Sequence, residues 1–210
     1  MKISYNWLKA YVPDNPEEDK LADIFTYHLC EVESIEKLTE GDFLFDLGIL
    51  PNRAHDLLSH QGIAKELSGL LGISFKDPTS LYKIPESKPT NLKVEIMGES
   101  CRRYSARIIR NVKVGPSPEW VVKHLESIGQ RSINNIVDAT NIVMYDCGQP
   151  THAFDLKKLV SEKIVIRNAE ANTELPVVGR EGIVAKLLGT DLVITDGEKN
   201  LALGGVKGGL

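Results

Sequence analysis

The segment from Arg131 to Asp155, RSINNIVDATNIVMYDCGQPTHAFD, constrains the chain more than any other stretch. Its polar residues recur at helical spacing and form one stripe: Asn134, Asp138, Asn141 and Tyr145. Mostly apolar residues fill the opposite stripe: Ile133, Ile136, Val137, Thr140 and Met144. The pattern predicts a helix whose apolar stripe lies in a core and whose polar stripe is available for chemistry.

This predicted helix ends at Gly148, and a turn follows it. Pro150 restricts Gln149 to an extended conformation, because the proline ring disfavours a helical residue before it. The turn would place His152 beside the polar stripe. Buried amides and histidines usually serve as hydrogen-bond partners that satisfy a core. Two interpretations therefore stand: a structural helix followed by a capping histidine, or a functional site.

Composition narrows the class of protein. The chain has 210 residues, 42% of them hydrophobic, which suffices for one large or two small domains. A net charge of -4 argues against nucleic-acid binding through a chain-wide basic surface, so any RNA contact must be local. Cys30, Cys101 and Cys147 are scattered, which favours neither a disulfide framework nor a metal site and fits a reducing cytosol. No long apolar run and no basic leader is present, so we expect a cytoplasmic protein without a membrane span or signal peptide.

The first part of the chain, residues 1–76, predicts a small α+β domain. Its expected elements are an apolar core segment over 2–12, a helix from an Asn15 N-cap, strands over 31–38 and 42–50, and a helix from an Asp56 cap to Gly72. Residues 77–91 contain three prolines among Ser, Thr and Lys and are predicted to be an interdomain linker.

Residues 92–210 predict a larger, mixed and strand-rich domain, mainly antiparallel, packed with the first. A helix is expected to begin at Ser117-Pro118 and to end at Gly129, just before the Arg131 segment. Strands are expected over 92–96, 102–112, 163–169, 174–179, 182–188, 191–196 and 201–205. The fold class is therefore α+β.

Glycines close to the end of the sequence complete a candidate site. The residues combined in it are Asn135, Thr140, Asn141, Pro150, His152, Gly204, Gly205, Gly208 and Gly209. Glycines after a strand let the backbone approach a ligand, and free N–H groups there could bind a carboxylate, a phosphate or a developing oxyanion. A tight turn is the alternative interpretation of GGVKGG. A P-loop is excluded because no Gly-Lys-Ser/Thr sequence follows.

Other chemistries find less support. His55 and His60 are five residues apart, whereas two metal ligands on one helical face are four apart. Cys147 and His152 lack any neighbour that would activate a thiolate. Arg102, Arg103, Arg107 and Arg110 form the most basic part of the chain, either a solvated strand face or a surface that faces phosphates.

Several stretches, taken in order, carry a resemblance to a known family. They are MKISYNWLKAYV at the start, ILPNRAHDLLSHQGIAKELSGLLG over 49–72, INNIVDATN over 133–141, GQPTHAFD over 148–155 and LVITDGEKNLALGGVKGG over 192–209. Together they resemble the bacterial phenylalanyl-tRNA synthetase β subunit, and the third and fourth resemble its B3/B4 editing domain. The resemblance covers essentially the whole chain. It implies an N-terminal piece with a B1-like first domain and a B3/B4-type domain that is truncated at its end. TEGD, residues 39–42, stands where most family members insert a tRNA-binding barrel.

The resemblance also implies an activity. The parent enzyme is an α2β2 ligase that uses ATP and magnesium to charge tRNA(Phe), with the α subunit and tRNA as partners and no cofactor in this piece. Its editing domain hydrolyses tyrosine esterified by mistake to tRNA(Phe). The implied catalytic residues are His152, Thr140 and Asn141; Asn135, Pro150, Gly204 and Gly205 would bind substrate, and Arg102, Arg103 and Arg107 would contact tRNA.

Two positions depart from the family pattern. Leu210 stands where many members have a glutamate thought to read the tyrosine hydroxyl, and Gly204 stands where alanine is common. Two rival hypotheses remain: a non-catalytic scaffold that docks the α subunit or tRNA, and a free-standing editing deacylase.

Overall fold

The computed structural model describes residues 1–177 and 184–209, and its backbone contacts group the chain into two compact units. The first unit comprises residues 1–84 and 114–151, and the second comprises residues 85–113 and the chain from His152 onward. This division differs from the predicted one, which assigned everything after residue 91 to the second domain. Residues 114–151 belong with the N-terminal residues because they share a hydrophobic core with them.

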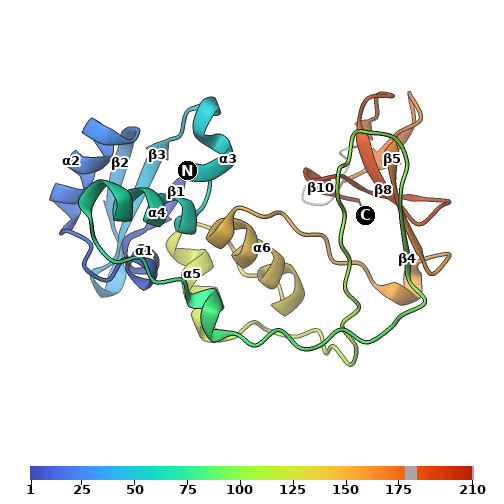
Figure 1. The fold of residues 1–210 in the computed structure, drawn as a ribbon, viewed down its shortest axis with the longest axis horizontal. Helices are drawn as coiled ribbons and strands as arrows, with labels where there is room; N and C mark the ends of the chain where they lie inside the picture. Colours follow the sequence, from blue (N-terminus) through green and yellow to red (C-terminus); the bar gives the residue numbers. More distant parts are fainter. Residues whose placement is uncertain (178–183, 210) are drawn as a thin grey trace. The chain divides into compact units, whose positions relative to one another are not determined.

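A three-stranded antiparallel sheet forms the frame of the first unit (Figure 1). Its strands, in sheet order, are β1 (Lys2–Ser4), β3 (Phe43–Gly48) and β2 (Glu31–Lys37). Ile3 pairs with Phe45, and both side chains are fully buried. The strands predicted over 31–38 and 42–50 are confirmed.

Helices surround this sheet. They are α1 (Tyr5–Tyr11), α2 (Glu18–His28), α3 (Ala54–Leu57), α4 (His60–Leu71), α5 (Glu119–Ser127) and α6 (Asn135–Cys147), with short 3-10 helices at Thr39–Gly41, Pro51–Arg53 and Pro78–Leu81. α1 contacts β3 and α4, and α2 contacts β2. The predicted C-cap of α4, Gly72, is confirmed by its left-handed backbone with φ 65°.

Two predicted caps are wrong. Asn15 lies in the loop before α2, where its N–H donates to Val12 O, and the helix begins three residues later. Asp56 lies inside α3 and binds Arg53. Ser59 caps α4 instead, because its hydroxyl accepts the Gly62 N–H at 3.0 Å.

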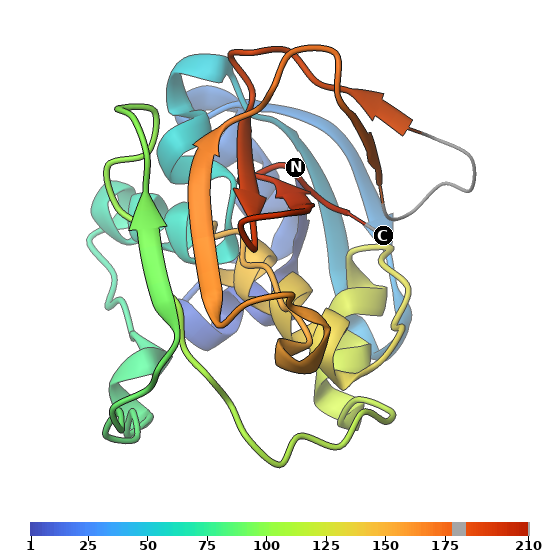
Figure 2. The same ribbon diagram turned by 90° about the vertical axis from the view of Figure 1, so that its right-hand side faces the viewer.

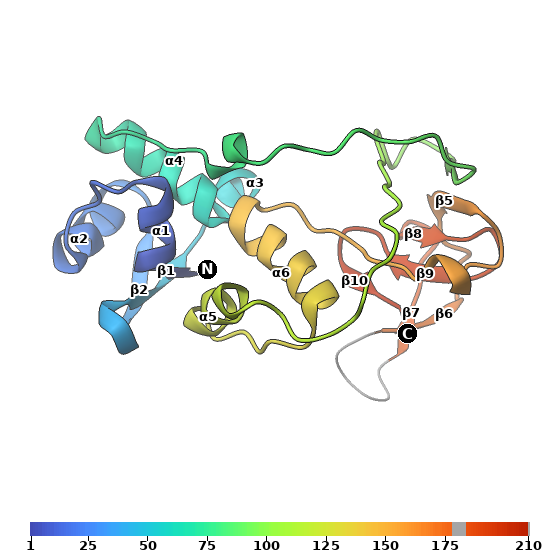
Figure 3. The same cartoon turned by 90° about the horizontal axis from the view of Figure 1, so that it is seen from below.

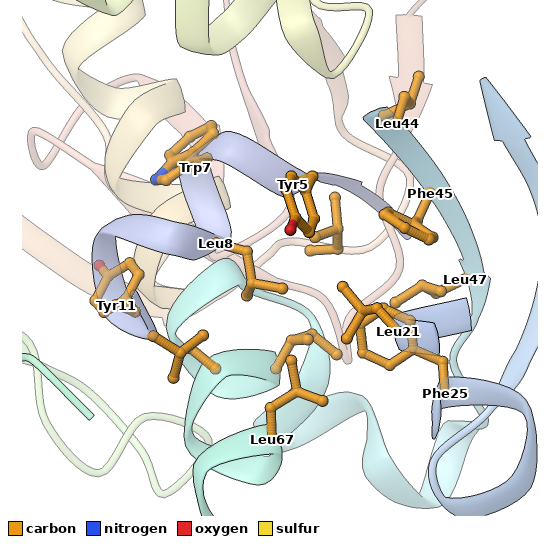
Figure 4. Packing of buried hydrophobic residues seen from close by; sticks show 14 of the residues in the cluster. Tyr5, Trp7, Leu8, Tyr11, Leu21, Phe25, Leu44, Phe45, Leu47 and Leu67 are labelled. Atoms are coloured by element: carbon orange, nitrogen blue, oxygen red, sulfur yellow. The ribbon is translucent and has the colours of Figure 1, made fainter. Parts of the chain in front are cut away.

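The core of the first unit lies among β1, β3, α1, α2 and α4 (Figure 4). Its largest fully buried side chains are Tyr11, Phe25, Phe45, Ile3, Leu8, Leu21, Leu47, Leu57, Ile63 and Leu67. Ile128, just after α5, is buried in the same cluster, and Ile142 and Tyr145 of α6 pack against it. Burying a side chain of this size stabilises a fold by about 1.5–3 kcal/mol. That gain explains why α5 and α6 join the first unit.

A five-stranded sheet forms the second unit. Its strands, in sheet order, are β10 (Lys207–Gly208), β9 (Asn200–Leu203), β8 (Leu192–Thr195), β5 (Lys163–Asn168) and β4 (Lys93–Ile96). β6 (Glu174–Pro176) and β7 (Val184–Lys186) form a separate hairpin, and a 3-10 helix spans Leu156–Lys158. β4 runs parallel to β5, whereas every other described pair is antiparallel (Figure 2). The predicted antiparallel arrangement therefore holds except at the β4 edge, where a long connection permits a parallel pair.

One predicted strand is absent from the described residues. Residues 102–112 show alternating apolar positions, yet they form no ladder. Tyr104 packs against the sheet core, while Ile109 is 74% exposed. Alternation indicates an extended backbone, but a strand also needs a partner, which no local pattern can supply.

Candidate functional site

Helix α6 carries three of the predicted site residues, and two residues of its polar stripe are buried or packed against the core. Asp138 is fully buried, and Tyr145 packs against the core of the first unit. Ile133, on the stripe predicted to be buried, is 65% exposed but precedes the helix, whereas the other members of that stripe are half-buried: Ile136, Val137, Thr140 and Met144. The predicted division into one buried and one open stripe is therefore wrong, because both stripes of α6 are partly buried.

Hydrogen-bond donors at the start of α6 explain why Asp138 can be buried. Its carboxylate accepts from Ser117 Oγ, from Ser132 Oγ at 2.6 Å and from Ile133 N at 2.9 Å. Burial alone would raise the pKa of Asp138, but these hydrogen bonds outweigh it and hold the pKa below its usual value. Asp138 is thus a structural anion, and Asn134 caps the same turn by accepting from Ile136 N and Val137 N.

Asn135 also makes hydrogen bonds within the fold. Its N–H donates to Gly115 O at 2.9 Å, and its Oδ1 accepts the Gly115 N–H at 3.2 Å. This two-way pairing ties the first residue of α6 to the segment before α5. The side-chain oxygen of Asn135 is thus engaged within the fold, and its substrate-binding role stays a prediction.

Thr140 and Asn141 offer more to a ligand. Both side chains are half-buried. The Thr140 hydroxyl donates to Val137 O at 2.7 Å, which leaves its lone pairs available as acceptors. Among the described residues, no group hydrogen-bonds to the Asn141 side chain, so its amide can both donate and accept.

The turn after α6 follows the predicted course. Gly148 adopts a left-handed backbone with φ 78°, and its N–H donates to Met144 O at 2.9 Å. Pro150 is exposed, and its carbonyl accepts from Gln149 Nε2 at 3.1 Å. The end of the helix at Gly148 is confirmed.

His152 belongs to the second unit, where it contacts the glycine turn. Its Nε2 accepts the Gly205 N–H at 3.3 Å, and its ring stacks on Phe154 with a centroid distance of 6.1 Å. Burial lowers the pKa of His152, because a desolvated imidazolium is disfavoured. The ring is therefore neutral near pH 7, and its proton lies on Nδ1 because Nε2 is an acceptor.

The glycines between β9 and β10 form a tight turn. The Gly204 N–H donates to Leu192 O at 2.7 Å, so neither it nor the Gly205 N–H is free, contrary to the prediction. Gly205 has φ 70°, which favours glycine. A Cβ on Gly209 would lie 2.7 Å from Leu201 O, and its N–H donates to that oxygen, so this glycine permits a close backbone approach. Gly208 pairs with Ala202 in the sheet.

The predicted site residues thus fall into two groups that the structure describes separately. Thr140, Asn141 and Pro150 belong to the first unit, and His152 and Gly205 lie together in the second. Leu210, the position expected to affect tyrosine selectivity, lies outside the described residues.

The arginines predicted to contact tRNA are exposed. Arg102, Arg103 and Arg107 all lie in the irregular segment after β4. In the described part of the chain, none of their guanidinium groups has an ion-pair partner. Their charges are therefore available to an external anion.

Two further observations concern other chemistries. A groove of about 350 Å³ lies between α5 and α6, which pack side by side (Figure 3). Its lining is mainly apolar, with Trp120, Val121 and Val143 among its residues, and its polar neighbour Ser117 is already bound to Asp138. Within residues 1–177 and 184–209, no three His, Cys, Asp or Glu side chains cluster to hold a metal, and no helix is long and apolar enough to cross a membrane.

Sequence reasoning missed a role for His60, which it weighed only as a metal ligand. The ring is fully buried and binds Ser4 and Tyr145, which lie 56 and 85 residues away in sequence. Contacts of this range leave no local pattern, so no signal in the sequence could have revealed them.

Comparisons with known proteins add family evidence. Residues 100–210 match a family model described as the B3/4 domain. The chain is 40% identical over its full length to the phenylalanine–tRNA ligase β subunit of Rhodopirellula baltica, of which it covers 30%. It is 42% and 43% identical to those of Syntrophotalea carbinolica and Geobacter metallireducens, over 83% and 80% of this chain and 22% and 21% of theirs. The chain therefore spans less than a third of the length of these relatives.

A solved structure is also similar, namely an N-terminal fragment of the phenylalanyl-tRNA synthetase β subunit from Pyrococcus horikoshii. It is 14% identical, with a TM-score of 0.46 over 100% of this chain and 62% of its own.

Proposed function

The chain belongs to the phenylalanine–tRNA ligase β-subunit family, and we propose that it carries an editing module that hydrolyses tyrosine from mischarged tRNA(Phe). One observation carries the proposal. A neutral, half-buried His152 holds its Nε2 lone pair against the backbone N–H of a glycine turn. A hydrogen-bond acceptor and a donor then lie side by side, as hydrolysis of an ester by water requires.

The physical need for such a module is clear. A pocket shaped for phenylalanine rejects tyrosine poorly, since an apolar pocket discriminates against one added hydroxyl by only about a hundredfold. A second site that hydrolyses the wrong ester raises the overall selectivity. Family membership makes this need relevant to the present chain.

In the proposed reaction, water displaces the long 3.3 Å contact between His152 and Gly205. Nε2 of His152 accepts a proton from this water while the water oxygen attacks the ester carbonyl carbon. The released Gly205 N–H donates to the oxyanion that forms. Collapse of the intermediate breaks the bond to the ribose oxygen, which takes the proton back from His152. The products are free tyrosine and tRNA with an intact ribose hydroxyl.

Thr140 and Asn141 are separate candidates, because they belong to the first unit and His152 to the second. On α6, the Asn141 amide can both donate and accept, and the Thr140 oxygen can accept from an amino group. Asn135 is omitted because its side chain is already bound to Gly115.

The proposal extends to the partners of a complete subunit. Arg102, Arg103 and Arg107 contact tRNA phosphates, because exposed guanidinium groups bind phosphate well. An α subunit, ATP and magnesium belong to the ligation reaction of a full-length enzyme. This chain covers less than a third of the length of its relatives. The chain itself needs no cofactor for the proposed hydrolysis.

A structural alternative has a specific observation in its favour. Gly204 N–H is bound to Leu192 O and Gly205 N–H to His152, as expected if this turn only stabilises the sheet. His152 would then be a scaffold residue. A His152→Ala variant separates the two functions. Hydrolysis predicts loss of tyrosine release with an unchanged melting temperature, whereas the scaffold predicts a lower melting temperature and no release from the wild-type protein.

A further inference from the structure

The His152 ring is held by two contacts within the second unit, and only one of them is a hydrogen bond. The Gly205 N–H donates to Nε2 at 3.3 Å, and among the described residues no group hydrogen-bonds to Nδ1. One long hydrogen bond leaves an imidazole free to turn about its side-chain bonds. The plane of the ring therefore depends on the second contact, which is with the ring of Phe154.

Phe154 lies parallel to His152. The two ring centroids are 6.1 Å apart, and the angle between the ring planes is 12°, an offset-stacked arrangement. Burial alternates along this part of the chain, because His152 and Phe154 are half-buried whereas Thr151, Ala153 and Asp155 are exposed. Alternate residues of an extended backbone point to the same side, which explains how the two rings meet.

The core of the five-stranded sheet fixes Phe154 in turn. The ring packs against a cluster of buried side chains from three adjacent strands: Ile164 and Ile166 of β5, Ile194 of β8 and Ala202 of β9. β9 ends at Leu203, two residues before Gly205. The donor to Nε2 and the ring that stacks on the imidazole are thus both attached to one sheet.

The backbone that follows Phe154 is tied to the same sheet. The Asp155 carboxylate accepts the Lys157 N–H at 3.0 Å and caps the short 3-10 helix. After that helix, the Val160 N–H donates at 3.1 Å to the carboxylate of Asp196, a buried residue that directly follows β8. These hydrogen bonds oppose any shift of the segment along the sheet, so more than its own packing sets the position of Phe154.

We infer that Phe154 is a positioning residue, whose ring holds the plane of the His152 imidazole so that Nε2 faces the Gly205 N–H. All three residues belong to the second unit. In the proposed reaction water displaces the contact with Gly205, and the stacked ring then keeps Nε2 directed at that water. The effect of Phe154 on hydrolysis rests on the proposed function. Its effect on the His152 ring does not.

Three substitutions separate the stacking from the packing. Phe154→Leu keeps an apolar side chain on the sheet core but has no ring to stack on His152. Phe154→Tyr keeps the ring and is the conservative variant. Tyr104→Leu is the matched control, because Tyr104 is a half-buried ring that packs against the same core cluster. In the described part of the chain, no ring contact joins Tyr104 to His152.

The experiment follows the ring nitrogens of His152 by NMR in the whole 210-residue chain with isotope-labelled histidine, and His152→Ala assigns the signals. We expect Phe154→Leu to shift both nitrogen signals toward a mixture of the two tautomers. The same variant should raise the pKa of His152 toward its usual value near 6.5, because water then reaches the ring. Phe154→Tyr and Tyr104→Leu should retain the wild-type signals and titration.

Tyrosine release from Tyr-tRNA(Phe) supplies the functional measurement. Phe154→Leu should lower kcat about tenfold and leave KM within about threefold of the wild-type value, because a misdirected base slows proton transfer and not binding. Phe154→Tyr should keep kcat within about twofold of wild type.

Unchanged His152 signals in Phe154→Leu would overturn the inference. Equal changes in Phe154→Leu and Tyr104→Leu would also overturn it, because they would reflect a general loosening of the core. If Phe154→Leu does not fold, the wild-type protein decides: we expect a nuclear Overhauser effect between the ring protons of His152 and Phe154, and its absence would contradict the stacking. If the wild-type protein releases no tyrosine, the proposed function fails, and the His152 signals alone decide whether Phe154 positions the ring.

Discussion

The Gly205 N–H donates to Nε2 of His152 at 3.3 Å, which joins the turn between β9 and β10 to the residue that follows the GQPT sequence. The pairing fixes the tautomer of His152 and occupies the atom that a general base needs. It is also longer than a typical N–H···N contact, so water can replace it at small cost.

The pH dependence of tyrosine release should follow His152. Burial lowers the pKa of this side chain, so the neutral, base-competent form persists below the usual histidine range near pH 6.5. We expect the rate to be constant around pH 7 and to fall only at a pH below 6.5. An acid limb centred above pH 6.5 would contradict the burial of this ring.

Gly62 should be essential to the close packing of α4 on α3. A Cβ added there would lie 1.8 Å from Asp56 O, a backbone atom that cannot move aside. We expect Gly62→Ala to reduce the free energy of unfolding by about 3 kcal/mol or more.

Gly69 provides the matched control for that substitution. It lies in the same helix, and a Cβ there would meet nothing within 4 Å. Gly69→Ala should raise stability by about 0.5–1 kcal/mol, since alanine is the better helix former. Urea unfolding of both variants tests the pair. Similar free energies of unfolding would contradict the close approach of Gly62 to Asp56 O.

The sequence predicted much of the backbone but not which residues of α6 are buried. The strands over 31–37, 163–168 and 192–195 and the helix end at Gly72 were predictable because alternation and glycine caps are local signals. Helical periodicity identified two stripes on α6, but it could not show that Asp138 of the polar stripe is fully buried. That burial depends on a hydrogen bond from Ser117, a residue 21 positions away.

Long-range contacts also limited how much of the domain boundary and of the candidate site could be predicted from the sequence. The proline-rich stretch 77–91 has the composition of a linker, yet Ile128 and Tyr145, which follow it, return to the first core. His152 and the glycines were identified through family resemblance. The resemblance could not show that the glycine N–H groups are already bound. The hydrogen bonds from Gly204 to Leu192 and from Gly205 to His152 appear only in the folded chain.

The stability of the protein should fall in mild acid because of His60. Burial, opposed by the Tyr145 hydrogen bond and aided by nearby His124, lowers the pKa of His60 to about 3. The unfolded chain, with a pKa near 6.5, binds the proton first, so this contribution is complete above about pH 6.5 and is lost as the pH falls toward 3.

The measurement compares wild type with His60→Asn at two pH values. Between pH 7 and pH 5 the wild-type free energy of unfolding should fall by about 2 kcal/mol more than that of the variant. The other histidines titrate in both proteins and cancel in the comparison. Parallel losses in the two proteins would mean that His60 titrates normally in the folded state.

The exposed arginines should determine the salt dependence of RNA binding. For each arginine that contacts a phosphate, replacement by glutamine should reduce the slope of log K against log salt by about 0.7–0.9. Arg102→Gln and Arg107→Gln, measured by fluorescence anisotropy with a labelled tRNA acceptor hairpin, test this expectation. Lys20→Gln, an exposed change on α2, is the control and should leave the slope unaltered. Equal effects of all three changes would indicate a general charge effect.

The most direct test of the account is the rate at which the unmodified 210-residue protein releases the amino acid from Tyr-tRNA(Phe), compared with Phe-tRNA(Phe) under the same conditions. We predict release of tyrosine well above the spontaneous rate of ester hydrolysis and at least about tenfold faster than release of phenylalanine. Equal rates for the two esters, or no release of tyrosine from a protein that melts cooperatively, would contradict an editing function for this chain.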